Sequence, residues 1–353
     1  MSSKIPVGIL GATGIVGQRL LSLLDQHPWF EPVWLAASER SEGKTYVEAA
    51  RWRLAQPLPA RFAGLTVQGP EPATCPTRVV LAALDAAAAA RIEPAFAAAG
   101  KLVISNSSAL RMHPEVPLLV PEVNPEHLQL LERQRTGELG RRGGGAITNP
   151  NCSTIGLVLA LAPLARGFGL RRVQVTTMQA ISGAGYPGVA SLDILGNVVP
   201  YIANEEEKME SETRKILGRL TRDGIEAAAT QVSAQCNRVA VEDGHMETVS
   251  VELERKAGLD EVRAAMAGFR GRPQELELPT APAQPLILLE AADRPQPRFD
   301  AERAGMSVLV GRLRPCPVFD YKFTLLSHNT LRGAAGAALL NAEWLQAEGR
   351  LPA

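Results

Sequence analysis

The sequence contains no long apolar run and no excess of charge of one sign. None of its hydrophobic stretches reaches the roughly eighteen uninterrupted apolar residues of a membrane-spanning helix. Its 37 Lys and Arg balance 37 Asp and Glu, so we expect no general attraction to nucleic acid or to an anionic membrane. The N-terminal MSSKIPVGILGATG lacks the layout of a signal peptide. These features favour a cytoplasmic protein.

Cysteine is scarce and dispersed. The four cysteines form no C-x-x-C pair and lie in no His-rich tract: Cys75, Cys152, Cys236 and Cys316. A zinc site or a disulfide scaffold is therefore not expected, we predict no bound metal, and a reducing compartment fits best.

With 353 residues, the chain is too long for one ordinary core, and two domains are expected. In the first half, apolar strands alternate with helical segments such as the alanine-rich 85–100. This rhythm predicts an α/β fold with a doubly wound parallel sheet. The charged, glycine-rich 131–145 is predicted to be an exposed connection between domains. The predicted strands of this half are 5–10, 31–38, 77–84, 101–108 and 117–123.

The second half combines one buried helix with strands that alternate in period two. A helix is predicted over 153–169, with Ser153 or Thr154 near its start. The stretch 238–254 is predicted to be a hairpin that turns at Asp243-Gly244. The chain closes with a helix over 331–349 that we predict to be amphipathic. Further predicted strands are 171–182, 306–315 and 321–330.

A glycine loop follows the first strand. G-x-x-G-x-x-G between a strand and a helix lets backbone amides approach a pyrophosphate, although such a loop can also be a tight structural turn. The loop residues predicted to bind a dinucleotide are Gly11, Ala12, Thr13, Gly14, Ile15 and Val16.

The end of the second strand indicates which dinucleotide binds. Four potential donors for a 2′-phosphate lie there, against one acidic residue, Glu39, and they favour NADP(H) over NAD. The alternative is that the two cations belong to a solvated loop. The four candidates are Ser38, Arg40, Ser41 and Lys44.

Cys152 lies in NPNCST, where an Asn-Pro turn meets a long apolar run. One interpretation is a small core residue that only packs. The other is a nucleophile, because a thiol in the first turn of a helix feels the positive end of the helix dipole and ionises more easily. Position alone does not decide between them.

A nucleophilic cysteine needs a proton-transferring partner. Of the five histidines, His27, His113 and His127 are predicted to lie on the surface, and His328 is ambiguous. His245 follows the Asp-Gly turn, and Arg238 lies seven positions earlier on the same predicted hairpin. This pair suits proton transfer to an anionic substrate, unless the histidine only packs.

Two polar stretches complete the set of candidates. SNSSALRM, residues 105–112, contains Arg111, which suits phosphate binding. The charged helix predicted over 204–215 is interpreted mainly as a solvated face.

Together these motifs resemble the aspartate-semialdehyde dehydrogenases, and most closely the branch found in archaea, fungi and some bacteria. The resemblance runs from about Gly8 to the closing helix. Ala240 departs from a proline that is frequent in this branch, and Glu242 adds a charge near the histidine. The motifs that carry it are GATGIVGQ, SNSSALRM, VPEVNPEH, NPNCST, QAISGAGYPGV, VVPYIANEEEKMESET and CNRVAVEDGHMETV.

The resemblance implies a Rossmann-type NADP-binding domain over 1–148, with the closing segment 329–353 packed back onto it. It implies an α+β catalytic and dimerisation domain with a mixed sheet over 149–328. A homodimer or homotetramer built on the sheet of the second domain is expected.

The resemblance also implies roles for single residues. Cys152 matches the nucleophile, His245 the acid/base, and Gln179 the glutamine that orients the thioacyl intermediate. The other matches are Arg238 for the substrate carboxylate, Glu205 for its amino group, Arg111, Lys208 and Asn151 around the phosphate, Ser182 and Gly183 near the nicotinamide, and Asn329 contacting the cofactor from the closing helix.

The implied activity is the NADPH-dependent reductive dephosphorylation of 4-phospho-L-aspartate to L-aspartate 4-semialdehyde through a cysteine thioester. This step belongs to the biosynthesis of lysine (through diaminopimelate), threonine and methionine. A malonyl-CoA reductase is the main alternative, since it resembles this branch closely. An acyl-glutamyl phosphate reductase and a catalytically silent NADP sensor are weaker alternatives.

Overall fold

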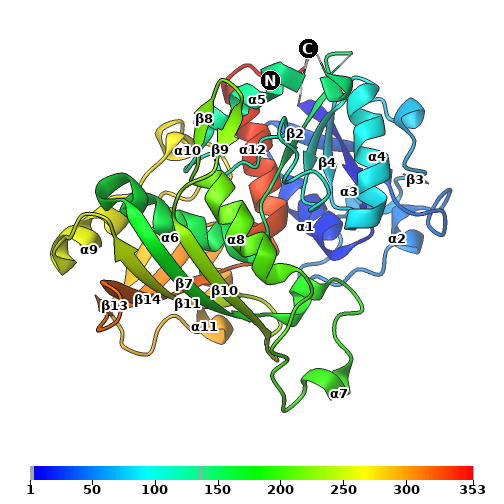
Figure 1. The fold of residues 1–353 in the computed structure, drawn as a ribbon. Helices are drawn as coiled ribbons and strands as arrows, with labels where there is room; N and C mark the ends of the chain where they lie inside the picture. The colour runs from blue at the N-terminus through cyan, green and yellow to red at the C-terminus, as the bar shows by residue number, and fades with distance from the viewer. Residues whose placement is uncertain (1–3, 135–136, 141, 353) are drawn as a thin grey trace.

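Two six-stranded sheets organise the chain, with a two-stranded sheet beside them (Figure 1). The computed structural model describes residues 4–134, 137–140 and 142–352. The expected combination of a parallel sheet and a mixed sheet in an α/β fold is confirmed. The domain limits at 148/149 and 328/329 stay predictions.

The first sheet is parallel throughout and has the order β3-β2-β1-β4-β5-β6. The strand order reverses between β1 and β4, which creates a switch point where ligands bind in such sheets. The predicted strands at 5–10, 31–38, 77–84 and 101–108 are all present. The six strands are β1 Ile5–Leu10, β2 Phe30–Ala36, β3 Val67–Gln68, β4 Val79–Ala82, β5 Leu102–Ser105 and β6 Gly145–Thr148.

The turn after β1 requires glycine at two positions. Gly11 has φ 77°, in the left-handed region. A Cβ on Gly17 would lie 2.4 Å from the carbonyl oxygen of Gly11. Helix α1, Ile15–Leu24, can therefore begin directly behind the turn with its N-terminus at the switch point.

The second sheet is mixed, with the order β10-β7-β11-β14-β13-β12. β7 pairs with β10 in parallel and with β11 in antiparallel fashion. The predicted hairpin over 238–254 is therefore wrong, because β7 lies between its two arms. The strands are β7 Leu170–Gln179, β10 Gln231–Arg238, β11 His245–Leu253, β12 Leu286–Leu289, β13 Val308–Pro315 and β14 Tyr321–Ser327.

Helix α6, Cys152–Phe168, packs on one face of this sheet. Under its later turns the sheet presents Val175, Val249 and Phe323, all buried. Towards the end of β7 and the start of β11 the same face becomes polar, with Thr177 opposite Glu247 in the register. The hydrophobic core therefore gives way to a buried polar row beside the start of α6.

The remaining helices cover the sheets or form short connections. α8, Glu205–Ile216, lies against α6 and β10. The longer ones are α4 Ala86–Ala98, α9 Leu259–Ala267, α11 Pro297–Ala304 and α12 Gly336–Ala347. The short ones are α2 Tyr46–Ala49, α3 Ala60–Ala63, η1 Pro72–Thr74, η2 Pro125–Gln129, α5 Leu130–Gln134, η3 Glu138–Gly140, η4 Ile181–Ala184, α7 Ser191–Ile194, α10 Arg272–Glu275 and the π-helical η5 Leu331–Ala335.

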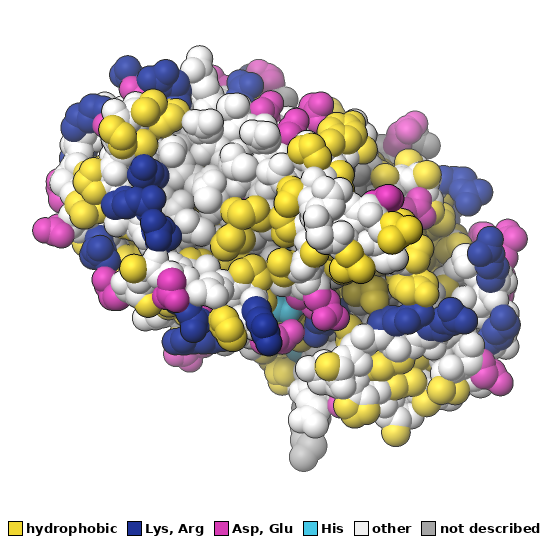
Figure 2. All heavy atoms as spheres, turned by 90° about the horizontal axis from the view of Figure 1, so that it is seen from below, with side chains coloured by type: hydrophobic (Ala, Val, Ile, Leu, Met, Phe, Trp, Pro, Cys, Tyr) yellow, Lys and Arg dark blue, Asp and Glu magenta, His cyan; other side chains and the backbone are white. Residues whose placement is uncertain are grey.

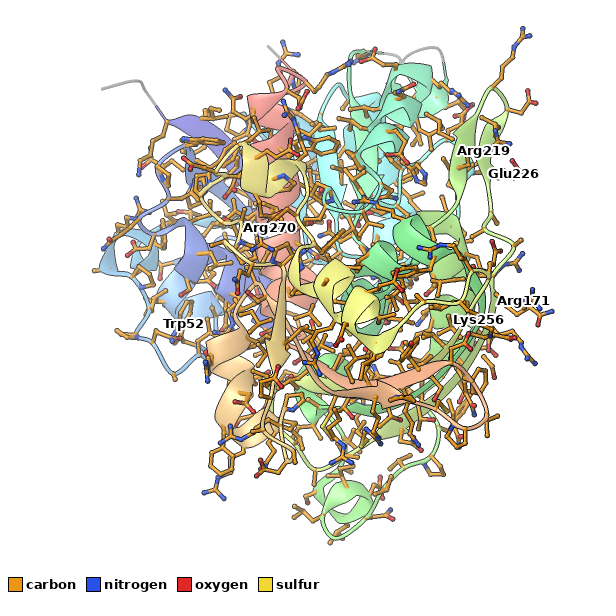
Figure 3. All side chains as sticks on the ribbon, turned by 90° about the vertical axis from the view of Figure 1, so that its left-hand side faces the viewer. Trp52, Arg171, Arg219, Glu226, Lys256 and Arg270 are labelled. Carbon is orange, nitrogen blue, oxygen red and sulfur yellow. The ribbon has the colours of Figure 1, made fainter. Side chains whose placement is uncertain are left out.

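The outer surface carries the exposed charges and some apolar side chains. β8 Arg219–Thr221 and β9 Gly224–Glu226 form the small sheet, with Arg219 and Glu226 at its edge (Figure 3).

Seen from below, hydrophobic side chains spread over the middle of the molecule (Figure 2). The projecting segment around α7 exposes Leu192, Leu195 and Tyr201. Among the described residues, no helix is long and apolar enough to cross a membrane.

Two predictions for the middle of the chain are wrong. The stretch 117–123 forms no strand; a single bridge joins Leu118 to Thr148. The stretch 131–145 is not an exposed connection, because Leu131 and Gln134 are buried and β6 belongs to the first sheet. The Gln134 amide donates to the Ala146 carbonyl and accepts from the Ala146 amide, both at 2.8 Å. Residues 135–136 and 141 lie outside the described part.

The closing helix is buried on all sides and is not amphipathic. It fills the core of the first sheet with Leu339, Leu340 and Trp344. Its polar residues are buried because they have partners: Glu343 Oε1 lies 2.8 Å from Nε2 of His27. His27 was predicted to lie on the surface but is a core residue. The same prediction is wrong for His127, which is also buried, with its Nδ1 2.9 Å from the side-chain amide nitrogen of Asn124.

A buried ion pair ties the loop after residue 117 to η5. Arg332 Nη2 lies 2.5 Å from Glu122 Oε1, and both side chains are almost completely buried.

We predict that Glu122→Ala lowers the free energy of unfolding by about 3–5 kcal/mol, because it leaves the arginine charge buried and unpaired. Urea denaturation measures the loss. Glu122→Gln combined with Arg332→Met removes both charges and should recover most of it; a double variant as unstable as the single one would contradict this account.

Candidate active site

Cys152 is the first residue of α6, and Asn151 caps the helix. The Asn151 side-chain oxygen accepts from the amides of Ser153 at 2.9 Å and Thr154 at 3.2 Å. The backbone of η5 packs behind the cysteine, since a Cβ on Gly333 would lie 2.7 Å from the Cys152 Cβ. The turn between β6 and α6 therefore holds the thiol in a defined place.

The thiol contacts one histidine. Cys152 Sγ lies 3.1 Å from His245 Nε2, and His245 is the first residue of β11. The Ala180 amide donates to His245 Nδ1 at 3.0 Å. Because Nδ1 accepts this bond, a neutral ring carries its proton on Nε2, directed at the sulfur. The predicted pairing of Cys152 with His245 is thus present, with the imidazole as the donor.

Burial controls the charge of this pair. It raises the pKa of Cys152 to about 12, with the charge of Glu205 adding to the rise and those of Arg111 and Arg238 opposing it. Burial also lowers the pKa of His245 to about 3, with Arg238 as the next cause. The predicted easily ionised thiol is therefore wrong for this arrangement. Desolvation outweighs the helix dipole, and both groups rest in the neutral form.

Glu205, the first residue of α8, holds two neighbours of the thiol. Its Oε1 accepts from the Asn151 side-chain amide at 2.7 Å and from the Gln179 amide at 2.8 Å. Lys208 Nζ lies 3.5 Å from its other oxygen and is partly exposed. Asn151, Gln179, Glu205 and Lys208 meet here although they come from the cap of α6, from β7 and from α8.

Two arginines, Arg111 and Arg238, lie close enough to Cys152 for their charges to act on the thiol. Arg238, at the end of β10, donates to the Ala180 carbonyl at 2.7 Å. A Cβ on Gly183 would lie 3.0 Å from both Arg238 Nη1 and His245 Cε1, so a side chain at this position would press on both groups. Arg111 Nη1 bonds to Glu212 at 2.9 Å.

A second polar network lies beside the glycine loop. Ser182 donates to Asp243 at 2.7 Å and accepts from the Asn329 amide at 2.7 Å, while the Asn329 oxygen accepts from the Gly244 amide at 2.8 Å. Asn329 lies in the turn before η5, not in the closing helix as predicted. A cavity of about 680 Å³ opens here between Ile15 of the first half and Ser182 of the second.

A further cavity, of about 600 Å³, lies at the end of β2. Ser38 and Arg40 line it, as does Arg91 from α4. The other two predicted donors are engaged or covered: Lys44 donates to the Arg40 carbonyl at 2.7 Å, and Ser41 is buried. Sequence reasoning missed Arg91, because one arginine on an alanine-rich helix is typical of a solvated surface.

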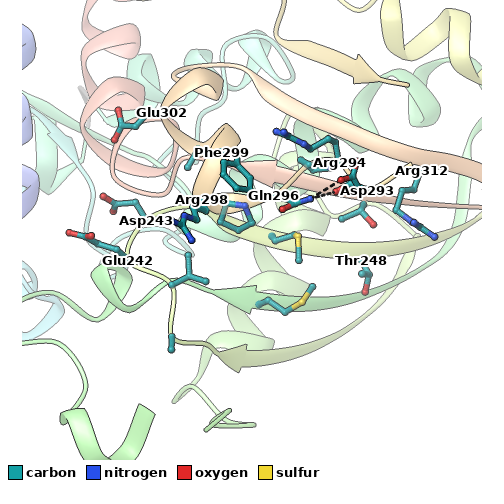
Figure 4. A pocket seen from close by; sticks show the side chains of 18 residues that line it. Glu242, Asp243, Thr248, Asp293, Arg294, Gln296, Arg298, Phe299, Glu302 and Arg312 are labelled. Carbon is teal, nitrogen blue, oxygen red and sulfur yellow. Dashed lines mark hydrogen bonds between the residues drawn. The ribbon is translucent and has the colours of Figure 1, made fainter. Parts of the chain in front are cut away.

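The opposite face of the second sheet is partly open and carries a hollow of about 890 Å³ (Figure 4). Met178, Met246 and Thr248 line it. They alternate along the strands with Gln179 and His245, which point to the other face. Residues of the candidate site and of this hollow are therefore immediate neighbours in sequence.

Comparisons with known proteins agree with this geometry. A family model described as "Semialdehyde dehydrogenase, NAD binding domain" matches residues 6–131, and one described as "Semialdehyde dehydrogenase, dimerisation domain" matches residues 161–332. The aspartate-semialdehyde dehydrogenase of Methanothermobacter thermautotrophicus is 49% identical, over 96% of this chain and 98% of that one. The chain belongs to the aspartate-semialdehyde dehydrogenase family.

Fungal members of the aspartate-semialdehyde dehydrogenase family are similar as well. The Cryptococcus neoformans enzyme is 48% identical over 96% of each chain. The crystal structure of the Candida albicans enzyme with NADP has a TM-score of 0.91 and 42% identity, covering 99% of this chain and all of that one. The resemblance noted in the sequence motifs is confirmed.

Glu247 is a buried acid to which no role was assigned from the sequence, although it lies within the motif CNRVAVEDGHMETV. It is fully buried on β11, and neither carboxyl oxygen has a hydrogen-bond partner among the described residues. Burial, with the Glu205 charge as a second cause, raises its pKa well above the ordinary value. The folded protein therefore keeps a proton that the unfolded chain releases above about pH 4.3.

This difference predicts a pH-dependent cost. Because the folded-state pKa is the higher one, stability falls as the pH rises from about 4.3 towards the folded-state pKa. Glu247→Gln removes the titration, so its gain in Tm over wild type should be larger at about pH 8 than at about pH 5. Thermal denaturation at both pH values measures it, with Glu207→Gln on exposed α8 surface as the control. An equal gain at both pH values would show that Glu247 does not titrate as described.

Proposed function

We propose that the chain catalyses the NADPH-dependent reductive dephosphorylation of 4-phospho-L-aspartate to L-aspartate 4-semialdehyde, in the biosynthesis of lysine, threonine and methionine. The observation that carries this proposal is the 3.1 Å contact between Cys152 Sγ and His245 Nε2. The charged groups that act on this thiol are Glu205, Arg111 and Arg238. A thiol with a hydrogen-bond donor and anion-binding arginines is suited to acyl transfer.

The charges around the thiol match the ends of such a substrate. Arg238 would bind the carboxylate, and Glu205 the amino group. Arg111, Lys208 and Asn151 would surround the phosphate. Holding the substrate at both ends brings its acyl carbon to the sulfur. An anion on Arg238 would also weaken the repulsion that lowers the pKa of His245.

The residues beside the glycine loop fit NADP(H). A glycine with positive φ and a helix N-terminus lie at the switch point of the first sheet, as a pyrophosphate requires. Arg40 and Arg91 line the cavity at the end of β2, where a 2′-phosphate would be bound. Ser182, Gly183 and Asn329 would lie near the nicotinamide. When bound there, NADPH would supply the hydride for reduction of the acyl carbon.

The protein groups account for the remaining steps. The Cys152 sulfur attacks the acyl carbon, and phosphate leaves with the thiol proton, which gives a thioester held by Gln179. After reduction, the oxygen of the tetrahedral intermediate carries a negative charge. His245 Nε2–H donates to this oxygen and then to the departing thiolate, which takes its proton from water. The geometry thus favours the donor half of the acid/base role.

The oligomer is proposed to be a homodimer, or a tetramer of two such dimers, in the cytoplasm. The family model over 161–332 is named for dimerisation. The face of the second sheet that α6 does not cover, with Met178, Met246 and Thr248, supplies a surface on which a second copy would pack.

A two-substrate assay tests the proposed activity. Purified wild-type protein should oxidise aspartate semialdehyde with NADP in the presence of phosphate, and should not oxidise malonate semialdehyde with CoA. Cys152→Ala should lower turnover by more than about 10³-fold, because no nucleophile remains, while the Kd for NADP stays unchanged. Cys316→Ala, at a half-buried position in the loop between β13 and β14, is the matched control and should keep full activity. CoA-dependent oxidation would instead identify a malonyl-CoA reductase.

Substitutions of His245 test its role as a donor. His245→Ala should lower kcat by about 10²–10³-fold, as expected for the loss of one oxyanion donor. His245→Gln keeps an N–H and should retain more activity. Because iodoacetamide attacks the thiolate, labelling of the Cys152 peptide is compared with wild type at alkaline pH, where it reports whether the thiol is still accessible in both variants. If the alanine and glutamine variants lose the same activity, hydrogen-bond donation is not what His245 contributes.

A further inference from the structure

Four charged residues on α8 form one polar stripe. Glu205, Lys208, Glu212 and Lys215 follow each other at spacings of three, four and three, so they lie on one side of the helix. The first two contact the candidate site directly. Glu212 and Lys215 lie further along the helix and are buried, although the proposed reaction uses neither of them.

Glu212 joins two segments that the site needs. Its Oε1 accepts from Arg111 Nη1 at 2.9 Å, and its Oε2 accepts from the backbone amide of Asn151 at 2.6 Å. Arg111 Nη2 bonds to the Asn106 carbonyl at 2.7 Å. Two fixed contacts thus set the plane of the guanidinium. A negative charge beside Arg111 weakens its attraction for phosphate, so recruiting an anion cannot be the contribution of Glu212.

Lys215 holds the backbone of the same arginine. Its Nζ donates to the carbonyls of Arg111 at 2.6 Å, His113 at 2.9 Å and Val116 at 3.0 Å. These three bonds use all three N–H groups of the ammonium. Burial lowers the pKa of Lys215 to about 8, opposed by Glu212. The segment after β5 is therefore wrapped around a buried cation from α8.

We propose that Glu212 and Lys215 are positioning residues that place the Arg111 guanidinium at a defined distance from Cys152 for recognition of the leaving phosphate. This inference rests on the proposed function, in which Arg111 binds that phosphate. Arg111 Nε has no partner among the described residues, although it is buried. An oriented guanidinium can direct this N–H at an anion. Glu212 binds both Arg111 and the turn of Cys152, whereas Lys215 binds the backbone of the segment that carries Arg111.

The experiment measures phosphate binding in two ways. The first is the KM for phosphate in the NADP-dependent oxidation of aspartate semialdehyde, and the second is the protection of Cys152 from iodoacetamide by inorganic phosphate. Arg111 and Asn151 donate to two different oxygens of Glu212. Glutamine has an NH2 group in place of one of them, so in Glu212→Gln one of the two donors faces another donor. We expect this variant to weaken phosphate binding by about tenfold or more in both measurements, with kcat lowered and the Kd for NADP unchanged.

Lys215 variants separate positioning from folding. Lys215→Met should raise the KM for phosphate to a similar extent while kcat at saturating phosphate stays within about threefold, because the Cys152 turn is not touched. Lys215→Arg keeps the donors and should restore phosphate binding. Glu207→Gln makes the same chemical change as Glu212→Gln on the exposed side of α8 and should match wild type.

A double variant identifies the residue through which Glu212 acts. Combined with Arg111→Lys, Glu212→Gln should weaken phosphate binding by less than about threefold, because the oriented guanidinium is already gone. Additive losses would overturn the inference, as would an unchanged phosphate KM and unchanged protection in Glu212→Gln. Wild-type protein without turnover but with Glu212-dependent protection by phosphate would reject the proposed reaction and retain the anion site.

Discussion

The turn from Asn149 to Cys152 is the constraint on which the site depends. Its side chains and backbone are bound from both halves of the molecule. The Asn149 amide nitrogen donates to the Ser105 carbonyl at 2.8 Å, and its side chain bonds to Asn106 at 2.9 Å and Asn341 at 2.7 Å. On the other side, Asn151 is held by α8. The sulfur therefore has one position relative to both sheets, and a small shift of either half would move it.

Burial of this turn sets the electrostatics of the reaction. In the low dielectric of the interior, an isolated thiolate is unfavourable, and so is an imidazolium beside Arg238. The resting pair is consequently neutral, and the charges that matter are permanent ones, on Arg111, Arg238 and Glu205. Because these charges are fixed by hydrogen bonds before a substrate arrives, they need little reorganisation when an anion develops. The site thus depends on prearranged charge more than on a reactive sulfur.

Local patterns in the sequence predicted much of the fold. The strand, glycine loop and helix from residue 5 to residue 24 are a contiguous unit, and α6 follows from an apolar run behind a capping asparagine. The hairpin was mispredicted because nothing within 238–254 reveals that β7 inserts between its arms. Arg238 and His245 were predicted to lie near each other because they were assigned to one hairpin. In the structure they lie near each other because β10 and β11 both pair with β7.

The roles of the buried polar residues could not be predicted, for a related reason. His27, Lys215 and Glu247 look like surface residues because their types are mostly exposed. Two of them are buried because partners far away in the chain accept or supply their hydrogen bonds. Glu247 has no such partner in the described chain and is neutral instead. Burial of an ionisable group thus depends on long-range contacts, which composition and periodicity do not report.

The alternation of the second sheet links the chemistry to the assembly. Along β7 and β11, the residues that face the site are Gln179 and His245, and the next residues, Met178 and Met246, line the open face. A partner that packs on this face would press on the same strands one residue away from the imidazole. The open face and the candidate site are therefore the two sides of the same pair of strands.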